Sequence, residues 1–146
     1  MTQRIVIDTS TLVGAVLRGD SVPHRAWIAA QKSFEILVSR ATFDELRSVL
    51  HRERLRRFLD PAIRDEFLEI YREVALWTEV EEADVKAVKP PCRDPKDNLF
   101  LALAKIGGAT SMISSDRDLL MMHPWRGIPI LTPAQFLEQN LKEPSL

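Results

Sequence analysis

Four acidic residues fall where strands of a sheet are expected to end or where the next helices are expected to begin. Asp8 closes an apolar run, and Asp116 follows another apolar run by two residues. Glu45 and Asp97 lie in the first turns of expected helices. Because open parallel sheets bind ligands beyond the carboxyl ends of their strands, we expect these four carboxylates to converge at one edge of a sheet.

Converging carboxylates indicate a metal site. They repel one another, and burial raises the cost of ionising them, so a divalent cation would supply the missing positive charge. The three histidines are scattered and Cys92 is the single cysteine, so oxygen ligands favour Mg²⁺ or Mn²⁺ over zinc. Such ions activate water and stabilise both oxygens of an in-line displacement at phosphorus. The pattern therefore predicts metal-assisted phosphodiester hydrolysis.

Three of these acids also have a structural explanation. Glu45 could complete a capping box that begins at Thr42. Residues 94–97 and 115–118 each place two acids where a helix dipole favours them. Asp8 differs, because the hydroxyl residues that follow it could cap the next helix on their own. An acid at the end of a buried strand, where no capping role requires it, therefore indicates a functional residue.

Apolar runs alternate with segments of helical periodicity along the chain. Strands followed by helices predict a parallel sheet covered on both faces, that is, a three-layer α/β/α fold. The length of 146 residues suits a single domain. We expect strands at 4–8, 34–38, 76–80, 111–114 and 128–131, and helices at 12–17, 21–30, 39–51, 61–74, 97–105 and after a capping box at 132–135.

Composition narrows the class of protein. A hydrophobic content of 45% and a charged content of 28% are typical of globular proteins. One cysteine excludes an intramolecular disulfide and fits a reducing compartment. No apolar run is long enough for a signal peptide or a bilayer span, so we expect a cytoplasmic protein without a membrane partner.

The charge distribution is uneven although the net charge is only −1. A basic patch beside an acidic pocket suits an enzyme that acts on a polyanion. The alternative is a solvated helix face. The tryptophans at 27, 77 and 125 could stack on bases, but core packing is the more frequent role. Arginines crowd residues 47–57, at Arg47, Arg52, Arg54, Arg56 and Arg57.

Four segments, in order, resemble those that carry the acids of PIN domains. They are Ile5-Val-Ile-Asp8-Thr-Ser-Thr-Leu12, then Glu45-Leu46 after a strand that ends at Ser39. The third is Cys92-Arg-Asp-Pro-Lys-Asp-Asn-Leu-Phe-Leu-Ala-Leu-Ala104, and the fourth is Ser114-Ser-Asp116-Arg-Asp118-Leu119. The resemblance covers a core of about residues 4–137 within a single domain of 1–146.

The nearest group in that family is the ribonuclease toxins of bacterial toxin–antitoxin systems. The resemblance implies a mostly parallel five-stranded sheet, Mg²⁺ or Mn²⁺, cleavage of single-stranded RNA and inhibition by a small antitoxin protein. A homodimer is compatible with it.

Residue roles follow from the resemblance. Asp8 and Asp97 would hold the principal ion, while Glu45 and Asp116 would complete the pocket, bind a second ion or orient the attacking water. The additional candidates are Asp94 and Asp118 as metal ligands, Ser10 and Ser115 as positioning groups, and Arg47, Arg52 and Arg93 as RNA contacts.

Two alternatives stay open. A receiver-type signalling domain also binds Mg²⁺ on a parallel sheet, but it would need paired acids after the first strand and a lysine after the last. A PIN-like module that has lost catalysis could serve as a binding partner, although all four acids are present.

Overall fold

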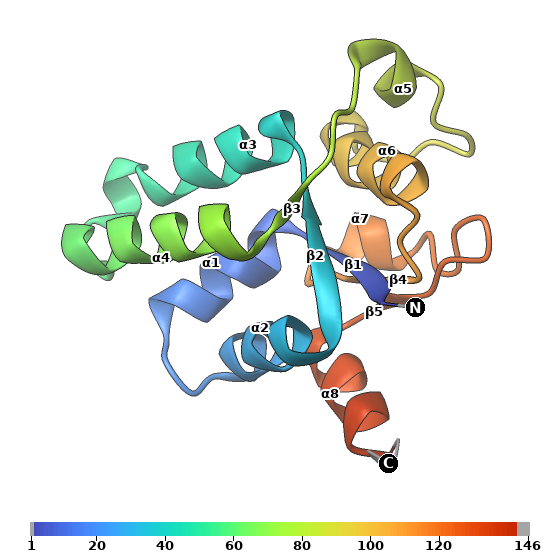
Figure 1. Ribbon diagram of the computed structural model, residues 1–146. Helices are drawn as coiled ribbons and strands as arrows, with labels where there is room; N and C mark the ends of the chain where they lie inside the picture. Colours follow the sequence, from blue (N-terminus) through green and yellow to red (C-terminus); the bar gives the residue numbers. More distant parts are fainter. Residues whose placement is uncertain (1, 143–146) are drawn as a thin grey trace.

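A five-stranded sheet forms the centre of the computed structural model, which describes residues 2–142 (Figure 1). Residues 1 and 143–146 of the expected domain lie outside the described part. All strand pairs are parallel, and the order is β3-β2-β1-β4-β5. The strands are β1 (Gln3–Ile7), β2 (Phe34–Val38), β3 (Leu76–Trp77), β4 (Ser111–Ile113) and β5 (Ile130–Leu131).

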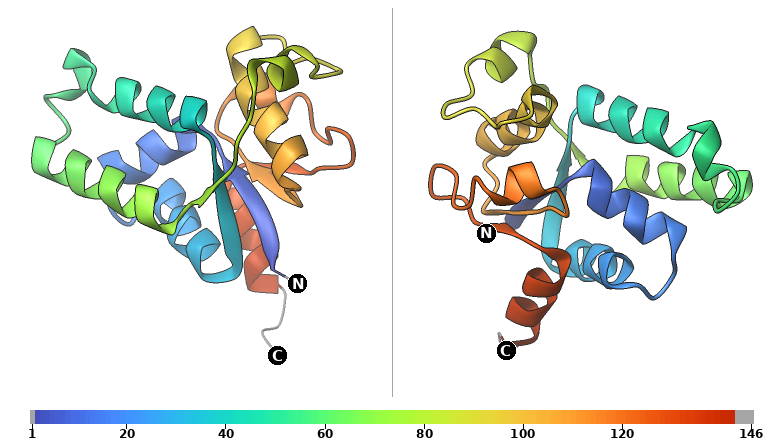
Figure 2. Two further views of the ribbon diagram at one scale, coloured as in Figure 1. Left: turned by 45° about the horizontal axis from the view of Figure 1, so that its top comes forward. Right: turned by 180° about the vertical axis from the view of Figure 1, so that it is seen from behind.

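Helices cover both faces of this sheet, which confirms the expected three-layer α/β/α fold (Figures 1 and 2). Short 3₁₀ turns, η1 (Glu53–Leu55) and η2 (Pro95–Asp97), precede α4 and α6. Among residues 2–142, none of the helices combines the length and apolar character needed to cross a bilayer. One face carries α1 (Thr9–Leu17), α2 (Val22–Ser33), α3 (Arg40–Leu50), α4 (Pro61–Val74) and α8 (Pro133–Lys142), and the other carries α5 (Glu82–Lys86), α6 (Asn98–Gly107) and α7 (Arg117–Leu120).

The central strands are apolar on both sides because each faces a separate helix layer. Ile5 and Ile7 of β1 pack in the core with the α1–α4 layer, whereas Val6 packs in the core with α6. Side chains alternate along a strand, so the buried part of a central strand is apolar at consecutive positions, as at residues 5–7 of β1 and 36–38 of β2. The close approach of α6 requires Gly107, where an added Cβ would lie 2.6 Å from Leu37 Cδ1.

Two strands are shorter by two or three residues than the sequence predicts. The third, expected over 76–80, ends at Trp77, and the Thr78 amide makes a last 2.8 Å hydrogen bond to the Val38 carbonyl before the chain turns into α5. The fifth, expected from residue 128, begins at Ile130 because Pro129 has no N–H to donate. Ile128 instead pairs antiparallel with Trp125.

Candidate active site

The expected acids meet in one cleft of about 380 Å³ beyond the carboxyl ends of β1, β2 and β4. They reach it from four separate segments of the chain, which only the tertiary fold brings together. Basic side chains lie on the same cleft. Its charged lining residues are Asp8, Glu45, Asp94, Asp97, Asp116, Arg52, Arg54 and Lys96.

Asp8 is held rigidly, with 2% of its surface exposed. Its Oδ1 accepts a 3.0 Å hydrogen bond from the Thr11 amide, so Asp8 itself caps α1. The expectation that only the following hydroxyls would cap this helix, from residue 12, is therefore wrong. Oδ2 accepts hydrogen bonds from the hydroxyls of Ser10 at 3.0 Å and Ser114 at 2.5 Å. Burial raises the pKa of Asp8, and these hydrogen bonds partly offset the increase.

Glu45 has no capping role, because Ser39 and Thr42 form the capping box of α3 by themselves. Its Oε2 is buried and has no hydrogen-bond partner among the described residues. The Thr9 hydroxyl lies close enough to lower the pKa of Glu45 but makes no hydrogen bond of acceptable geometry with it. Burial dominates and raises that pKa, and the negative charge of Asp8 adds to the increase. Glu45 thus presents an unsatisfied carboxylate oxygen at the cleft.

Asp97 lies between η2 and α6 and is 7% exposed. Burial raises its pKa to about 8, and the carboxyl group of Asp116 contributes through a hydrogen bond and through its charge. The charges of Asp94 and Asp8 act in the same direction. Its side chain makes no hydrogen bond that caps α6. A capping hydrogen bond therefore does not account for Asp97.

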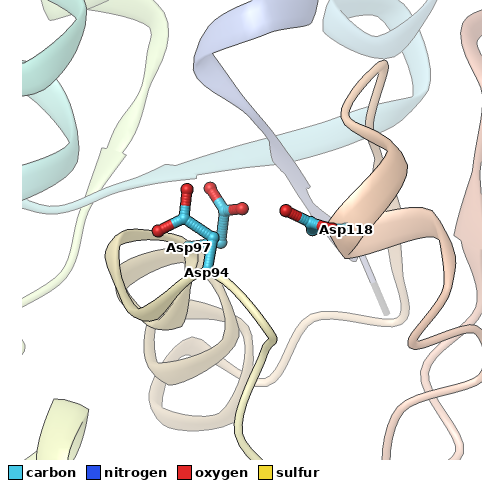
Figure 3. A group of neighbouring side chains, drawn as sticks. All are labelled: Asp94, Asp97 and Asp118. Atoms are coloured by element: carbon cyan, nitrogen blue, oxygen red, sulfur yellow. The ribbon is translucent and has the colours of Figure 1, made fainter.

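A second acid accompanies each of the last two positions. Asp94 caps η2 by accepting a 3.0 Å hydrogen bond from the Lys96 amide, and Asp116 caps α7 through the Asp118 amide at the same distance. Oxygens of Asp94, Asp97 and Asp118 lie within 4.8 Å of one another, and Figure 3 shows the Asp118 side chain directed from α7 toward the two acids that precede α6. These three carboxylates are close enough to share one cation.

The other candidates lie at different places. Ser10 contacts Asp8, whereas the exposed Ser115 shares a 2.9 Å hydrogen bond with the Thr11 hydroxyl. Arg52 lines the cleft. Arg93 is exposed and does not line it. The structure does not bring Arg47 there either, since Arg47 pairs with Asp44 over 3.6 Å beside another hollow.

Sequence reasoning missed two functional candidates. Lys96 lines the cleft, and its position between Asp94 and Asp97 was the available signal. Ser114 fixes Asp8 across the boundary between β1 and β4. A hydroxyl at the end of the strand that precedes Asp116 was the only sign of it.

Comparisons with known proteins agree with this geometry. A family model described as PIN domain matches residues 4–118, and the chain belongs to that family. No curated protein matches the chain by sequence. PIN domains form a family of nucleases, so the family and the acid cleft indicate the same class of enzyme.

Solved structures share the fold at low sequence identity. PAE2754 from Pyrobaculum aerophilum has a TM-score of 0.60 at 16% identity, over 96% of this chain and 91% of its own. VapBC2 from Rickettsia felis, bound to a DNA fragment from its promoter, has a TM-score of 0.62 at 12% identity, over 88% and 97%. VapC20 of Mycobacterium tuberculosis, a sarcin–ricin loop cleaving toxin, has a TM-score of 0.54 at 15% identity, over 78% and 91%.

Proposed function

We propose that this protein is an endoribonuclease that cleaves single-stranded RNA with Mg²⁺ or Mn²⁺, and that it is the toxin of a toxin–antitoxin pair. The observation that carries the proposal is the convergence of Asp8, Glu45, Asp97 and Asp116 in one cleft. Membership of the PIN family makes the receiver-type alternative untenable.

The cleft fits a divalent cation. The buried Glu45 oxygen lacks a hydrogen-bond partner, and burial raises the pKa of Asp8, Glu45 and Asp97, with neighbouring carboxylates adding to the increase at Glu45 and Asp97. All the ligand candidates are oxygens, which suits Mg²⁺ or Mn²⁺. When bound, such an ion supplies positive charge that polarises the phosphate and lowers the pKa of a nearby water.

Residues of the cleft would bind the ion, hold its ligands in place and position the attacking water. Asp8 and Asp97 hold the principal ion, and Ser10, Ser114 and the Thr11 amide keep Asp8 in place. Asp116 completes the pocket, with Asp94 and Asp118 as further ligands. Glu45 uses its free oxygen to orient the attacking water.

The basic residues of the cleft favour the binding of a polyanionic substrate. Arg52, Arg54 and Lys96 place positive charge beside the acids, where phosphates that flank the scissile bond would lie. Phosphate contacts position a nucleic acid without reading its sequence. We propose cytoplasmic RNA as the substrate, and the fold likeness to VapC20, a sarcin–ricin loop cleaving toxin, supports a nuclease of the toxin class.

An apolar groove supports an antitoxin as partner. This groove of about 520 Å³ runs between α1, α2 and α4, and its wall includes the exposed side chains of Ile28, Ile63 and Ile70. The fold likeness to VapBC2, a toxin–antitoxin complex, supports an antitoxin protein as the partner of this chain. We assign the groove to an amphipathic antitoxin segment, a common way of covering such a surface.

RNA cleavage by the purified protein tests the function. We expect a flexible single-stranded RNA to be cut with Mn²⁺ and to stay intact with EDTA. Asp8→Asn should remove nearly all activity, whereas Glu69→Gln, at an exposed acid of α4 outside the cleft, should not. A folded protein that binds RNA but never cuts it would support the inactive binding module instead.

A further inference from the structure

A second hollow, of about 450 Å³, lies on the other side of α3 from Glu45. Arg40, Asp44 and Arg47 lie at helical spacing along one stripe of α3 and line this hollow. Arg72 of α4 and Trp77 of β3 line it as well, over the buried ring of Phe43. We refer to these six residues as the arginine–tryptophan pocket.

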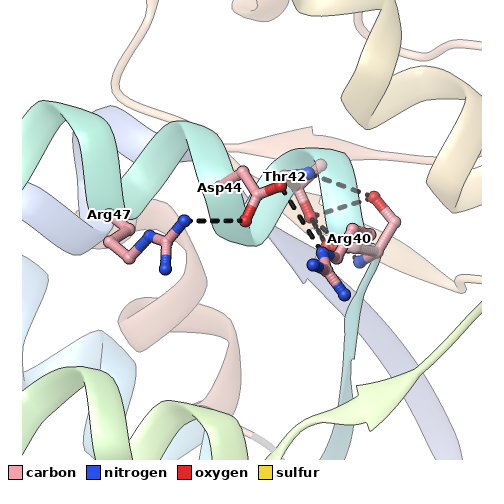
Figure 4. A network of polar contacts seen from close by, with 5 residues as sticks. Arg40, Thr42, Asp44 and Arg47 are labelled. Carbon is pink, nitrogen blue, oxygen red and sulfur yellow. Dashed lines mark hydrogen bonds and ion pairs between the residues drawn. The ribbon is translucent and has the colours of Figure 1, made fainter.

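The pocket carries more positive than negative charge. Asp44 alone faces three arginines, at 3.6 Å from both Arg40 and Arg47 (Figure 4). Close charge-assisted hydrogen bonds measure about 2.7–2.9 Å, so these pairs are loose and leave guanidinium donors available. Arg72 stacks over the Phe43 ring at 5.3 Å, and no ion pair of Arg72 occurs among residues 2–142. The pocket therefore favours an anion.

Trp77 gives the pocket an aromatic wall of fixed orientation. Its Nε1 donates a 3.0 Å hydrogen bond to the Arg72 carbonyl, and its ring packs 5.3 Å from that of Phe43. The side chain is nevertheless 44% exposed. A neighbouring hollow, lined by Thr78, Glu79 and Val80, shares Arg40 and Trp77 with the arginine–tryptophan pocket. An indole held in this way offers a stacking platform.

We propose that the arginine–tryptophan pocket is a second binding site for single-stranded RNA. Arg40, Arg47 and Arg72 would contact backbone phosphates, and a base would stack on Trp77. This inference rests on the proposed function, because it assigns the pocket to a flanking part of the RNA that is cut in the acid cleft.

One helix separates the two sites. Glu45 of α3 reaches the acid cleft while Asp44, its neighbour, lines the pocket. A helix with its side chains is about 10–12 Å across, a distance that a few nucleotides of an extended strand can cover. A long strand could thus engage both sites, and its second contact would be intramolecular. Longer RNA should therefore bind more tightly than short RNA.

Binding of oligouridylates of two to ten nucleotides, measured in EDTA, tests the pocket without cleavage. Trp27 and Trp125 are buried, so Trp77 is the one exposed indole of the chain and reports directly by fluorescence. We expect the oligonucleotides to quench it. Trp77→Leu should abolish the quenching and weaken binding of a fluorescein-labelled decamer about tenfold.

The arginines have a separate test that leaves the aromatic packing intact. Arg47→Gln changes an exposed side chain and should flatten the salt dependence of decamer binding by about 0.7 in log–log slope. Arg72→Gln should do the same. Arg25→Gln, an exposed arginine of α2, serves as the matched control and should leave the slope unchanged.

The outcomes separate this inference from the proposed function. Quenching and altered slopes without any metal-dependent cleavage would uphold the pocket and reject the nuclease. Cleavage of long RNA with an unchanged KM in Trp77→Leu and Arg47→Gln would overturn the pocket and leave the nuclease standing. If these variants instead change only the molecular mass measured by light scattering, the face is a protein interface and the inference is wrong.

Discussion

The hydroxyl of Ser114 donates a 2.5 Å hydrogen bond to Oδ2 of Asp8 and so joins the end of β4 to the end of β1. Both residues are buried. The same hydroxyl accepts a 2.9 Å hydrogen bond from the Asp116 amide. Ser114 therefore fixes the relative positions of two acids that come from distant parts of the chain.

Ser114→Ala should loosen both acids. Supporting residues around a metal site typically affect activity by about 10–100-fold, and we expect a loss of that size in RNA cleavage. The free energy of unfolding should fall by about 1–3 kcal/mol, because Asp8 loses a buried partner. Ser115→Ala is the matched control, since Ser115 contacts Thr11 rather than a carboxylate. Equal cleavage rates for the two variants would contradict the role of Ser114.

The raised pKa of Asp97 predicts how stability depends on pH without metal. The folded value of about 8 lies above the ordinary 3.8, so the folded state binds the proton more tightly. The free energy of unfolding gained from this proton is fully present below pH 3.8 and is lost as pH rises through about 8. Chemical denaturation in EDTA at several pH values should show this decline, and Asp97→Asn should flatten it.

Bound metal should reverse the relative stability of the wild type and the Asp97→Asn variant. Above pH 7 in EDTA, we expect Asp97→Asn to be more stable by about 1 kcal/mol. With Mn²⁺ at a hundredfold excess over Kd, wild type should gain about 2.7 kcal/mol and the variant less. Thermal melting under both conditions checks this. A variant that is less stable by the same margin in both would mean that Asp97 is not a ligand, and would shift attention to Asp94.

Arg52 and Arg54 should bind RNA at the acid cleft, whereas Arg56 and Arg57 should not. The first two line the cleft, and the other two are exposed nearby in the same segment. Replacing Arg52 and Arg54 by glutamine should weaken RNA binding regardless of sequence and flatten the salt slope by about 0.7 per lost contact. The Arg56/Arg57 double variant is matched in charge. Identical slopes for both would restore the interpretation of this segment as a solvated face.

The apolar groove predicts how growth inhibition is relieved. Expression of the chain alone should slow bacterial growth, and a small protein encoded beside its gene should co-purify with it and restore growth. Ile63→Asp should prevent the rescue, because it places a charge in the groove. Ile106→Asp, at a similarly exposed position on α6, should still be rescued. Rescue of both variants would place the partner elsewhere.

Much of the fold follows from local sequence, because each central strand ends in consecutive buried apolar residues. The meeting of Asp8, Glu45, Asp97 and Asp116 could also be predicted, since the carboxyl ends of parallel strands share one edge. The short helix α5 was missed, and α7 was anticipated only as a possible helix start at residues 115–118. Five and four residues are too few for a helical period to stand out from a loop.

The arginines show where a linear description fails. Arg47 and Arg52 lie close in sequence and were expected to share one role, yet they line different hollows. Arg47 lies on α3 about 200° around the helix from Glu45 and so faces away from the cleft, whereas Arg52 lies after the end of α3 at Leu50. Charge content indicated one basic region, but the rotation of α3 and its end at Leu50 divide that region between two sites.

The tight packing of Gly107 against Leu37 lets a position far from the acid cleft influence the placement of Asp97. α6 begins beside Asp97 and ends at Gly107, so about 15 Å of stiff helix connects this proposed metal ligand to a position with no room for one more methyl group. A side chain at residue 107 would force Leu37 or the helix to move, and a moving helix acts as a lever on the carboxylate at its other end. Natural variation in catalytic rate among relatives could therefore arise at the back of the sheet, where the cleft itself is unchanged.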